Sequence, residues 1–547
     1  MKHKKVFLVI IAVVFLAYGN ALFNGFTGDA KSLFKNNNFY KNPSNITKIF
    51  TKDFLMQPQD LTGSYELGVP SYSGFLSYRP VTALFFFFDY FLWKDKPWGH
   101  HLTNLLLHIF VCLLLYVLVL QLTRNKKVSV FSVLLFAAHP IHSEAVCNVG
   151  YRSDIVSTLF LLLTLVLYLH FKKATGSTKK ALGFSYATFF LALFSKETAL
   201  ALPILLFFMD YWFCAPEEKR SFLKGRKRIY LVYLAIFAFY IVVYFFVMKN
   251  IFYGKNLFKE VTFLDKCALI VSVFSNYMAA FLLPWKVNVL PPLYVPAFNE
   301  VGIIIFLILL IVMLLHRTLT RQPEVTFWLL WFVVTILPVS NAVLLLNPYA
   351  FRFMYLPSVG VLVLIAYAVI FLLDFLQKKI RWKHFEAITK AFLIGLCISL
   401  TMSNNAFLKN SLVAAKEMIR NYPDSSRPYW ILGLEYFERG QHDKAIFYLS
   451  QYLKREPRNP FVLDPKRNFS VYYLLGRCHL PYGRRSIPFF KKAILLKPDY
   501  VLVYKDLIQV YLRLGETDKA HSVYQEAKAV LKDGDSLEYL KKVIDEN

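Results

Sequence analysis

Long apolar stretches recur along most of the chain, and they constrain its fold more than any other feature. Roughly twelve of them reach the ~20 residues that a helix needs to cross a bilayer. Because lipid offers no partners for backbone polar groups, such segments must be helical. We therefore predict an all-α, polytopic membrane bundle. The stretches start near residues 5, 101, 128, 152, 181, 198, 229, 263, 300, 325, 355 and 388.

The composition agrees with a membrane location. Hydrophobic residues make up 56% of the 547 residues and charged residues 18%, whereas soluble domains have about 45–50% and about 25%. This excludes a soluble enzyme, a coiled coil and a disordered chain. Aromatic blocks such as LFFFFDYFLW at 84–93 are typical of lipid-facing helices and interfacial belts. The six cysteines form no C-x-x-C motif, so neither a disulfide framework nor a zinc site is indicated.

The net charge of +28 indicates a membrane topology rather than a nucleic-acid-binding surface. Much of the basic excess stands between apolar stretches, and such residues gather on the cytoplasmic side of membrane proteins. With the N-terminus inside, the first seven apolar segments alternate without conflict. The first is expected to be an uncleaved anchor; a cleaved signal peptide is the alternative, but NALFNGF at 20–26 offers no clear cleavage site. The basic tracts are 2–5, 124–127, 172–180, 219–228 and 377–384.

One later apolar stretch must fail to cross, because the basic tracts at 316–321 and 377–384 both belong inside. We favour 263–284, which opens with Asp265, carries Asn276 and ends in the proline-rich PWKVNVLPPLYVP. Such a segment suits a re-entrant or interfacial path. About eleven crossings then remain, and the C-terminus lies outside.

From about residue 407 the sequence becomes polar and repetitive. It matches the W-x2-L-G-x2-Y…A-x3-F…P pattern of tetratricopeptide helix pairs, whose Tyr and Leu positions are structural. Such a solenoid has no chemistry of its own and presents a concave groove to a peptide or partner protein. We predict a transmembrane domain at 1–406, with a catalytic first outer loop at 23–100, and a repeat domain at 407–547, with repeats near 427–460, 470–500 and 502–535 and a capping helix at the end.

Ionisable residues gather at the outer ends of the predicted helices. Charges at membrane depth are costly and are usually retained for function. One candidate base together with several Arg, His and Lys side chains suits phosphate binding. The residues are Asp29, Arg79, Asp89, His100, His101, His139, His142, Glu144, Arg152, Asp154, Lys196, Glu197 and Arg352.

Each of these features also has a structural interpretation. His139 and His142 stand three apart on one helical face and could bind a metal, but His-Pro-x-His near a helix end is more often a hydrogen-bonded cap. Arg79 could anchor an aromatic helix at the interface. The charges in Arg152–Asp154 and in Lys196–Glu197 could pair with each other at short turns.

Seven motifs stand in order along the chain before the repeats. They are FNGFTGDAKSLF (23–34), YRPVTALFFFFDYFLWKDKPWGHHLTNLLLH (78–108), FAAHPIHSEAV (136–146), YRSDIVSTLF (151–160), SKETALALP (195–203), PVSN (338–341) and RFMYLPSVG (352–360). Together they resemble the transmembrane and tetratricopeptide repeat-containing proteins and their bacterial relatives. That family belongs to the GT-C class of glycosyltransferases, whose members use a polyprenyl-phosphate sugar on the outer side of the membrane. Its animal members resemble protein O-mannosyltransferases that use dolichyl phosphate mannose.

The resemblance implies a membrane glycosyltransferase with Asp29 as the catalytic base. Asp29 would deprotonate a Ser/Thr or sugar hydroxyl for an inverting attack on the anomeric carbon, while basic groups stabilise the departing lipid phosphate. The lipid-linked sugar is the substrate, no cofactor or metal is assigned, and the repeats recruit the acceptor. The predicted donor-binding residues are Arg352 and Arg79, then His139, His142 and Lys196, with Glu144, Arg152, Asp154, Glu197 and Tyr355.

The chain departs from the family pattern at two positions. Family members commonly carry an Asp-Asp pair where this chain reads Gly28-Asp29-Ala30, and a Glu where it has Phe351. One base suffices for an inverting displacement, so activity is still expected. The alternatives are a non-catalytic membrane scaffold for envelope proteins and a lipid-linked sugar transporter. We favour a bacterial inner membrane with periplasmic repeats over an endoplasmic reticulum membrane.

Overall fold

The computed structural model shows helices and loops, and no strand, in the part of the chain that it describes. The prediction of an all-α bundle followed by helical repeats is therefore confirmed for this part. The described residues are 2–35, 38–51, 77–173, 179–213, 222–252, 262–286, 303, 307, 323–343, 345, 348–380, 382, 384–455, 468–531 and 534–546.

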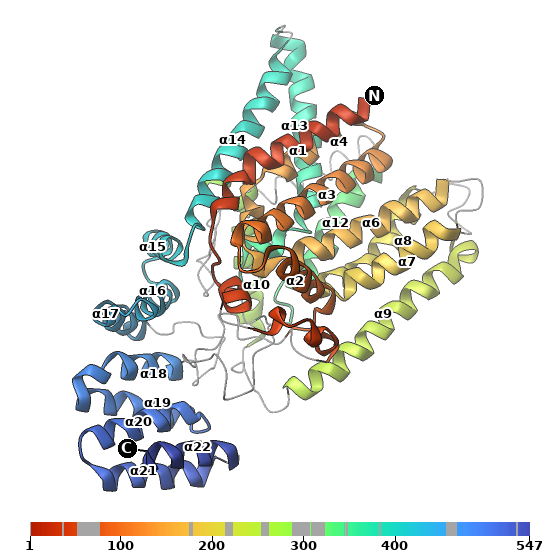
Figure 1. Cartoon of the computed structure of the whole chain (residues 1–547). Coiled ribbons are helices and arrows are strands. Elements are labelled where there is room, and N and C mark those ends of the chain that lie inside the picture. The colour runs from red at the N-terminus through yellow and green to blue at the C-terminus, as the bar shows by residue number, and fades with distance from the viewer. Residues whose placement is uncertain are drawn as a thin grey trace.

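The helices of the membrane part form one bundle, in which α3 is central (Figure 1). Helices α1, α4 and α6 all pack against α3, and 61% of its apolar window is buried, against 11% for α9 and 17% for α14. The last two helices therefore lie at the edge of the bundle. The bounds are α1 Lys2–Tyr18, α2 Pro80–Trp93, α3 Pro97–Thr123, α4 Lys126–Ala138, α5 Ser143–Cys147, α6 Ser153–Lys173, α7 Lys179–Leu193, α8 Leu202–Phe213, α9 Phe222–Phe252, α10 Phe263–Leu282, α12 Pro323–Ile336, α13 Ser358–Ile380 and α14 Phe385–Phe407.

Seven described helices are long and apolar enough to cross a membrane, and eight are if α4 and the bent segment after it form one span. Helices α7, α8 and α12 are apolar but shorter, at 15, 12 and 14 residues. The apolar stretch near residue 300 lies largely outside the described residues. The chain is thus a multi-pass membrane protein, whereas the total of about eleven crossings stays a prediction.

The stretch at 263–284, which we favour as the one that does not cross, is helical over its first 20 residues, and its failure to cross stays a prediction. These residues form α10, a continuous 20-residue helix that is long and apolar enough to span. Its polar residues support the helix: Thr262 and Asp265 form a reciprocal capping box at its start, and the Asn276 amide donates to the Ser272 carbonyl at 2.8 Å. The proline-rich sequence from 287 to 296 lies outside the described residues.

The C-terminal part is a run of antiparallel helix pairs, drawn in blue in Figure 1. Small residues allow the two helices of a pair to approach. A Cβ on Gly433 would lie 2.6 Å from Leu449 Cδ2, and one on Gly476 would lie 2.5 Å from Phe490 Cε1. The helices are α15 Ser411–Asn421, α16 Arg427–Glu438, α17 His442–Lys454, α18 Phe469–Cys478, α19 Ile487–Leu496, α20 Val501–Arg513, α21 Thr517–Val530 and α22 Gly534–Asp545.

Candidate functional site

The candidate residues lie at one end of the bundle, which we call the loop end. Helices α1, α4, α7 and α14 finish there, and α3, α6 and α13 begin there, because successive helices run in opposite directions. The first loop, which follows α1, covers this end. The repeats continue directly from α14, so they start at the loop end as well (Figure 1).

Asp29 is buried in the first loop, with only 5% of its surface exposed. It follows Gly28, whose φ of +53° is in the left-handed region that favours glycine. A Cβ on Gly150 would lie 2.9 Å from the Ala30 amide nitrogen and 3.0 Å from Asp29 Cβ. The turn before α6 thus packs closely on Asp29 only because it has a glycine there. The Asn148 side chain accepts from the Gly150 amide at 3.0 Å and fixes that turn.

Arg352 is held near Asp29 by two contacts with Glu144. Its Nη1 pairs with one carboxylate oxygen, and its backbone amide donates to the other at 3.0 Å. Its guanidinium lies 4.0 Å from the centre of the Tyr151 ring. Burial alone would lower the pKa of Arg352, but nearby acidic groups, Glu144 foremost and Asp29 among them, raise it above its ordinary value. Arg352 therefore stays a cation.

Lys196 is a second buried cation beside this group. Its ammonium pairs with Asp154 of α6 at 2.5 Å and lies 5.2 Å from the centre of the Phe353 ring. Asp154 also acts electrostatically on Arg352. The Lys196–Asp154 pair therefore belongs to the same charge cluster as Arg352 and Asp29.

Arg79 forms the third pair of the cluster. Its Nη2 and Nε donate to the two oxygens of Glu197 at 2.8 and 3.3 Å, and its Nη1 donates to Ser153 Oγ at 3.2 Å. Burial would raise the pKa of Glu197, but the charges of Arg79 and Lys196 more than offset it and lower this pKa to about 2. Glu197 is thus an anion throughout the physiological pH range.

The interpretation that Arg152 pairs with Asp154, and Lys196 with Glu197, within single turns is wrong. Lys196 pairs with Asp154 rather than with its neighbour Glu197. Arg152 pairs at 2.5 Å with Asp89 of α2 and donates to Asn104 at 2.6 Å. Arg152 and Asp89 are both fully buried, so this pair joins α2 to α6 inside the protein rather than facing a substrate.

The histidines act as hydrogen-bonding groups at a helix break. His139 and His142 do not share a helical face, because Pro140 begins a new turn and the axis bends by 48°. His139 Nδ1 accepts from the Ile141 amide at 3.2 Å, as in the cap interpretation. His142 contacts Ser358 Oγ at 2.8 Å. Among the residues described, no group of three or more His, Cys, Asp or Glu side chains could hold a metal ion.

Tyr355 lies in the same buried layer as these histidines. Its hydroxyl is 2.6 Å from His108 Nδ1, and its ring packs against His142. The side chain is fully buried. In this position Tyr355 supports the segment that carries Arg352 rather than facing the Asp29 loop.

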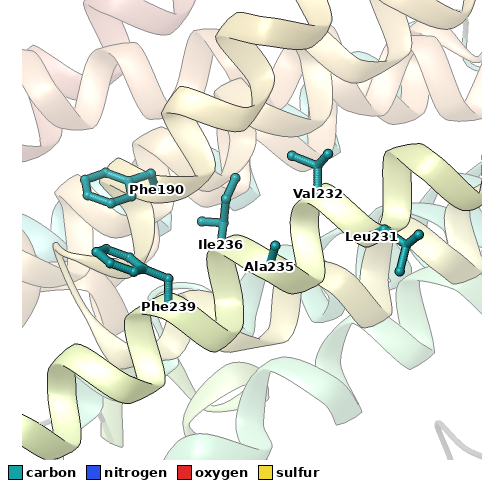
Figure 2. Close-up of a pocket in the computed structure, with 6 residues that line it drawn as sticks. All are labelled: Phe190, Leu231, Val232, Ala235, Ile236 and Phe239. Atoms are coloured by element: carbon teal, nitrogen blue, oxygen red, sulfur yellow. The ribbon is translucent and has the colours of Figure 1, made fainter.

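An apolar groove of about 410 Å³ lies between α7 and α9 (Figure 2). Several of its lining side chains are exposed, as expected of a lipid-facing surface. Because the lining carries no charged group, the groove cannot bind phosphate or sugar hydroxyls. It is lined by Phe190, Leu231, Val232, Ala235, Ile236 and Phe239.

Several residues that complete the cluster were not predicted from the sequence. Tyr151 is one: Asp29, Glu144 and Arg352 all act electrostatically on its hydroxyl. Asn148 and Gly150, which shape the turn beside Asp29, are others. A third case is Arg427 of α16, a repeat-domain residue that also acts on Tyr151. Its place in an amphipathic repeat gave no sign of a role at the membrane domain.

The fold and the site define a multi-pass helical membrane protein with C-terminal tetratricopeptide repeats and a buried charge cluster at one end of its bundle. Residues 79–245 match the family described as dolichyl-phosphate-mannose-protein mannosyltransferase. Residues 426–459 match a tetratricopeptide repeat. The resemblance found from the motifs is thereby confirmed.

Individual relatives carry the name protein O-mannosyl-transferase. The chain is 34% identical to human TMTC3 over 169 residues, 31% of this chain and 17% of that protein. It is 33% identical to Drosophila melanogaster Tmtc2 over 213 residues, 37% of this chain and 21% of that protein. It is 29% identical to Caenorhabditis elegans F38B6.6 over 164 residues, 29% of this chain and 22% of that protein. The matches thus span about a fifth of each relative.

One solved structure that aligns with the chain is that of the Archaeoglobus fulgidus oligosaccharyltransferase tethered to an acceptor peptide. It has a TM-score of 0.43 and 15% identity, and the alignment covers 84% of this chain and 60% of that one.

Proposed function

We propose that this protein is a membrane glycosyltransferase. It transfers a sugar such as mannose from a polyprenyl-phosphate donor to a protein Ser/Thr or glycan hydroxyl at the loop end, and its repeats recruit the acceptor. The relatives named protein O-mannosyl-transferase support the reaction class. The observation that carries the proposal is the convergence of Asp29 with Arg352: the Arg352 guanidinium lies 4.0 Å from the centre of the Tyr151 ring, and Gly150, the residue before Tyr151, packs directly on Asp29.

The reaction needs one base and one anion-stabilising group. Asp29 takes the proton of the acceptor hydroxyl as that oxygen forms a bond to the anomeric carbon. The bond between the anomeric carbon and the phosphate oxygen breaks, and the lipid phosphate leaves with the electron pair. A cation must meet that charge, and Arg352 is the first candidate. One displacement of this kind inverts the anomeric configuration.

The carboxylate partners of the cations serve to position them. Glu144 holds Arg352, Asp154 holds Lys196 and Glu197 holds Arg79. Long cationic side chains lose conformational freedom when they bind an anion, so cations that are fixed beforehand stabilise the leaving group more effectively. Arginine also presents a fork of donors, which lets it bind a carboxylate and a phosphate at once.

The test is Asp29→Asn in membranes that contain the full-length chain, supplied with radiolabelled polyprenyl-phosphate mannose. Loss of the base is expected to lower incorporation of label into protein by roughly 10²–10⁴-fold. The measurement is acid-precipitable label against time, at equal amounts of the protein in the membrane.

Asp95→Asn is the matched control, because Asp95 is an exposed carboxylate at the same end of the bundle, paired with Lys41 at 3.2 Å. It should leave transfer unchanged. Unchanged transfer in Asp29→Asn would remove Asp29 as the base. If Asp29→Asn and Arg352→Met both left transfer unchanged, the charge cluster would be structural; a non-catalytic scaffold would instead show no transfer by the unmodified chain.

A further inference from the structure

The first loop is bound to the repeat domain by a two-sided ion pair. The Lys31 ammonium lies 2.6 Å from Glu435 Oε1 and 2.5 Å from Glu438 Oε2. The three side chains are 11–19% exposed, so solvent screens the contact less than it would a surface pair. Both glutamates stand on α16, the first helix of the first repeat. We call this contact the Lys31 clamp.

A second attachment holds the other side of the same loop. The Gly25 amide donates to the Lys409 carbonyl at 2.9 Å, and the Asn24 amide group donates to the Asn405 carbonyl at 3.0 Å. These acceptors lie at the junction between α14 and α15. Asp29 is therefore fixed between two contacts, one four residues before it and one two residues after it, and both partners come from the C-terminal part of the chain.

Helix α16 also reaches the charge cluster. Arg427, its first residue, is only 7% exposed and acts electrostatically on the Tyr151 hydroxyl, as do Asp29 and Arg352. The repeat domain thus contacts the first loop at the Lys31 clamp and places Arg427 near Tyr151.

We propose that α16 is part of the active site, and that Glu435 and Glu438 are positioning residues that act on Asp29 through Lys31. This proposal rests on the proposed function. A base contributes fully only when it is held within hydrogen-bonding reach of the acceptor hydroxyl. The Asp29 loop is built from short helices only, one of which begins at Lys31, so the clamp adds rigidity that a longer packed helix would otherwise give.

The proposal differs from simple recruitment of an acceptor by the repeats. If the repeats only recruited the acceptor, breaking the clamp would raise KM for the acceptor and spare hydrolysis of the donor, in which water replaces the acceptor hydroxyl. If the clamp positions Asp29, its loss lowers kcat for transfer and lowers hydrolysis by a similar factor. Hydrolysis of the donor alone therefore separates the two roles.

The experiment compares Lys31→Met and the double variant Glu435→Gln/Glu438→Gln with the unmodified full-length chain. Membranes are supplied with radiolabelled polyprenyl-phosphate mannose, with and without acceptor. Both variants should lower transfer and hydrolysis by about 10- to 100-fold, with KM for the donor unchanged. Lys31→Arg keeps the charge and should retain most of the activity.

The matched control is Arg484→Met, which removes a cation paired with Glu516 within the repeats at 2.5 Å and should leave both rates unchanged. Unchanged hydrolysis in the clamp variants would overturn the proposal, provided that Asp29→Asn is inactive. If Asp29→Asn kept full transfer, Asp29 would not be the base, and the clamp proposal would fall together with that assignment. The proposal would also be overturned if Lys31→Arg lost as much transfer and hydrolysis as Lys31→Met, because the positive charge of residue 31 would then not be the property that positions Asp29.

Discussion

Buried charges are costly, and the cations Arg152, Lys196 and Arg352 at the loop end are each paired with a carboxylate from another part of the chain. The pair of Arg152 with Asp89 is the most deeply buried, with neither side chain exposed. Thr103 and His100 supply further contacts to the Asp89 carboxylate, at 2.8 and 3.2 Å. Such a pair resembles a structural link more than a binding site, because a phosphate could reach Arg152 only by displacing α2.

We therefore expect Arg152→Met to destabilise the protein. It leaves the Asp89 charge buried without its main partner, and breaking a buried pair in this way costs about 3–5 kcal/mol. Thermal unfolding of the detergent-solubilised chain measures the effect as a lower midpoint.

Arg152→Met combined with Asp89→Asn should recover most of the lost stability, because no unpaired charge remains. The double variant should also retain glycosyl transfer. A stable double variant that bound the donor poorly would instead assign Arg152 to the phosphate site.

At the scale of elements, the position of Arg352 depends on how closely α13 approaches α12. A Cβ on Gly360 would lie 2.4 Å from the Trp328 carbonyl oxygen, which is backbone and cannot turn aside. The Trp331 indole donates to the Leu356 carbonyl at 3.1 Å and ties the start of α13 to the same helix. The segment with Arg352 directly precedes this contact. The packing of α13 on α12 therefore fixes the position of the Arg352 guanidinium along the bundle axis.

Gly360→Ala should accordingly force the two helices apart. Overpacking of this kind costs about 1–3 kcal/mol, and the shift should also lower transfer because it moves Arg352. The measurements are the thermal midpoint and the rate of transfer to acceptor.

Gly395→Ala is the control, since a Cβ at this helical glycine of α14 meets nothing within 4 Å. It should be neutral or slightly stabilising, by up to about 1 kcal/mol. If both glycine variants behaved alike, close packing of α13 on α12 would not be what positions Arg352.

The positions of most helices could be predicted from the sequence, whereas most side-chain contacts between helices could not. The lengths of the apolar stretches predicted where the helices lie, because the thickness of the bilayer sets the length of a spanning helix independently of the helices packed around it. The partners of Arg152 and Lys196 could not be predicted, because each cation has a carboxylate close by in the sequence. The packing of α2 and α6 determines which carboxylate each cation contacts. Asp265, which stood in the sequence only as a charge in an apolar stretch, caps the start of α10. The Lys31 clamp joins residues about four hundred positions apart, and no local pattern reveals it.

For the whole molecule, the clamp constrains how the chain lies in the membrane. The first loop touches α16 directly, so the first loop and the repeats must face the same side. The basic tracts at 2–5 and 124–127 lie at the opposite end of the bundle from that loop. Because such tracts stay in the cytoplasm, we propose that the loop end and the repeats are outside.

Single cysteines at exposed positions test this orientation with a membrane-impermeant maleimide. Thr47→Cys in the first loop and Asp518→Cys in α21 should both react in right-side-out vesicles, whereas Lys126→Cys at the start of α4 should react only after permeabilisation. The unmodified chain gives the background from its own cysteines. Labelling of Thr47→Cys and Asp518→Cys from opposite sides would contradict the Lys31 clamp, because the two segments could not then touch. Labelling of both from the side of Lys126→Cys would contradict the outside location of the reaction.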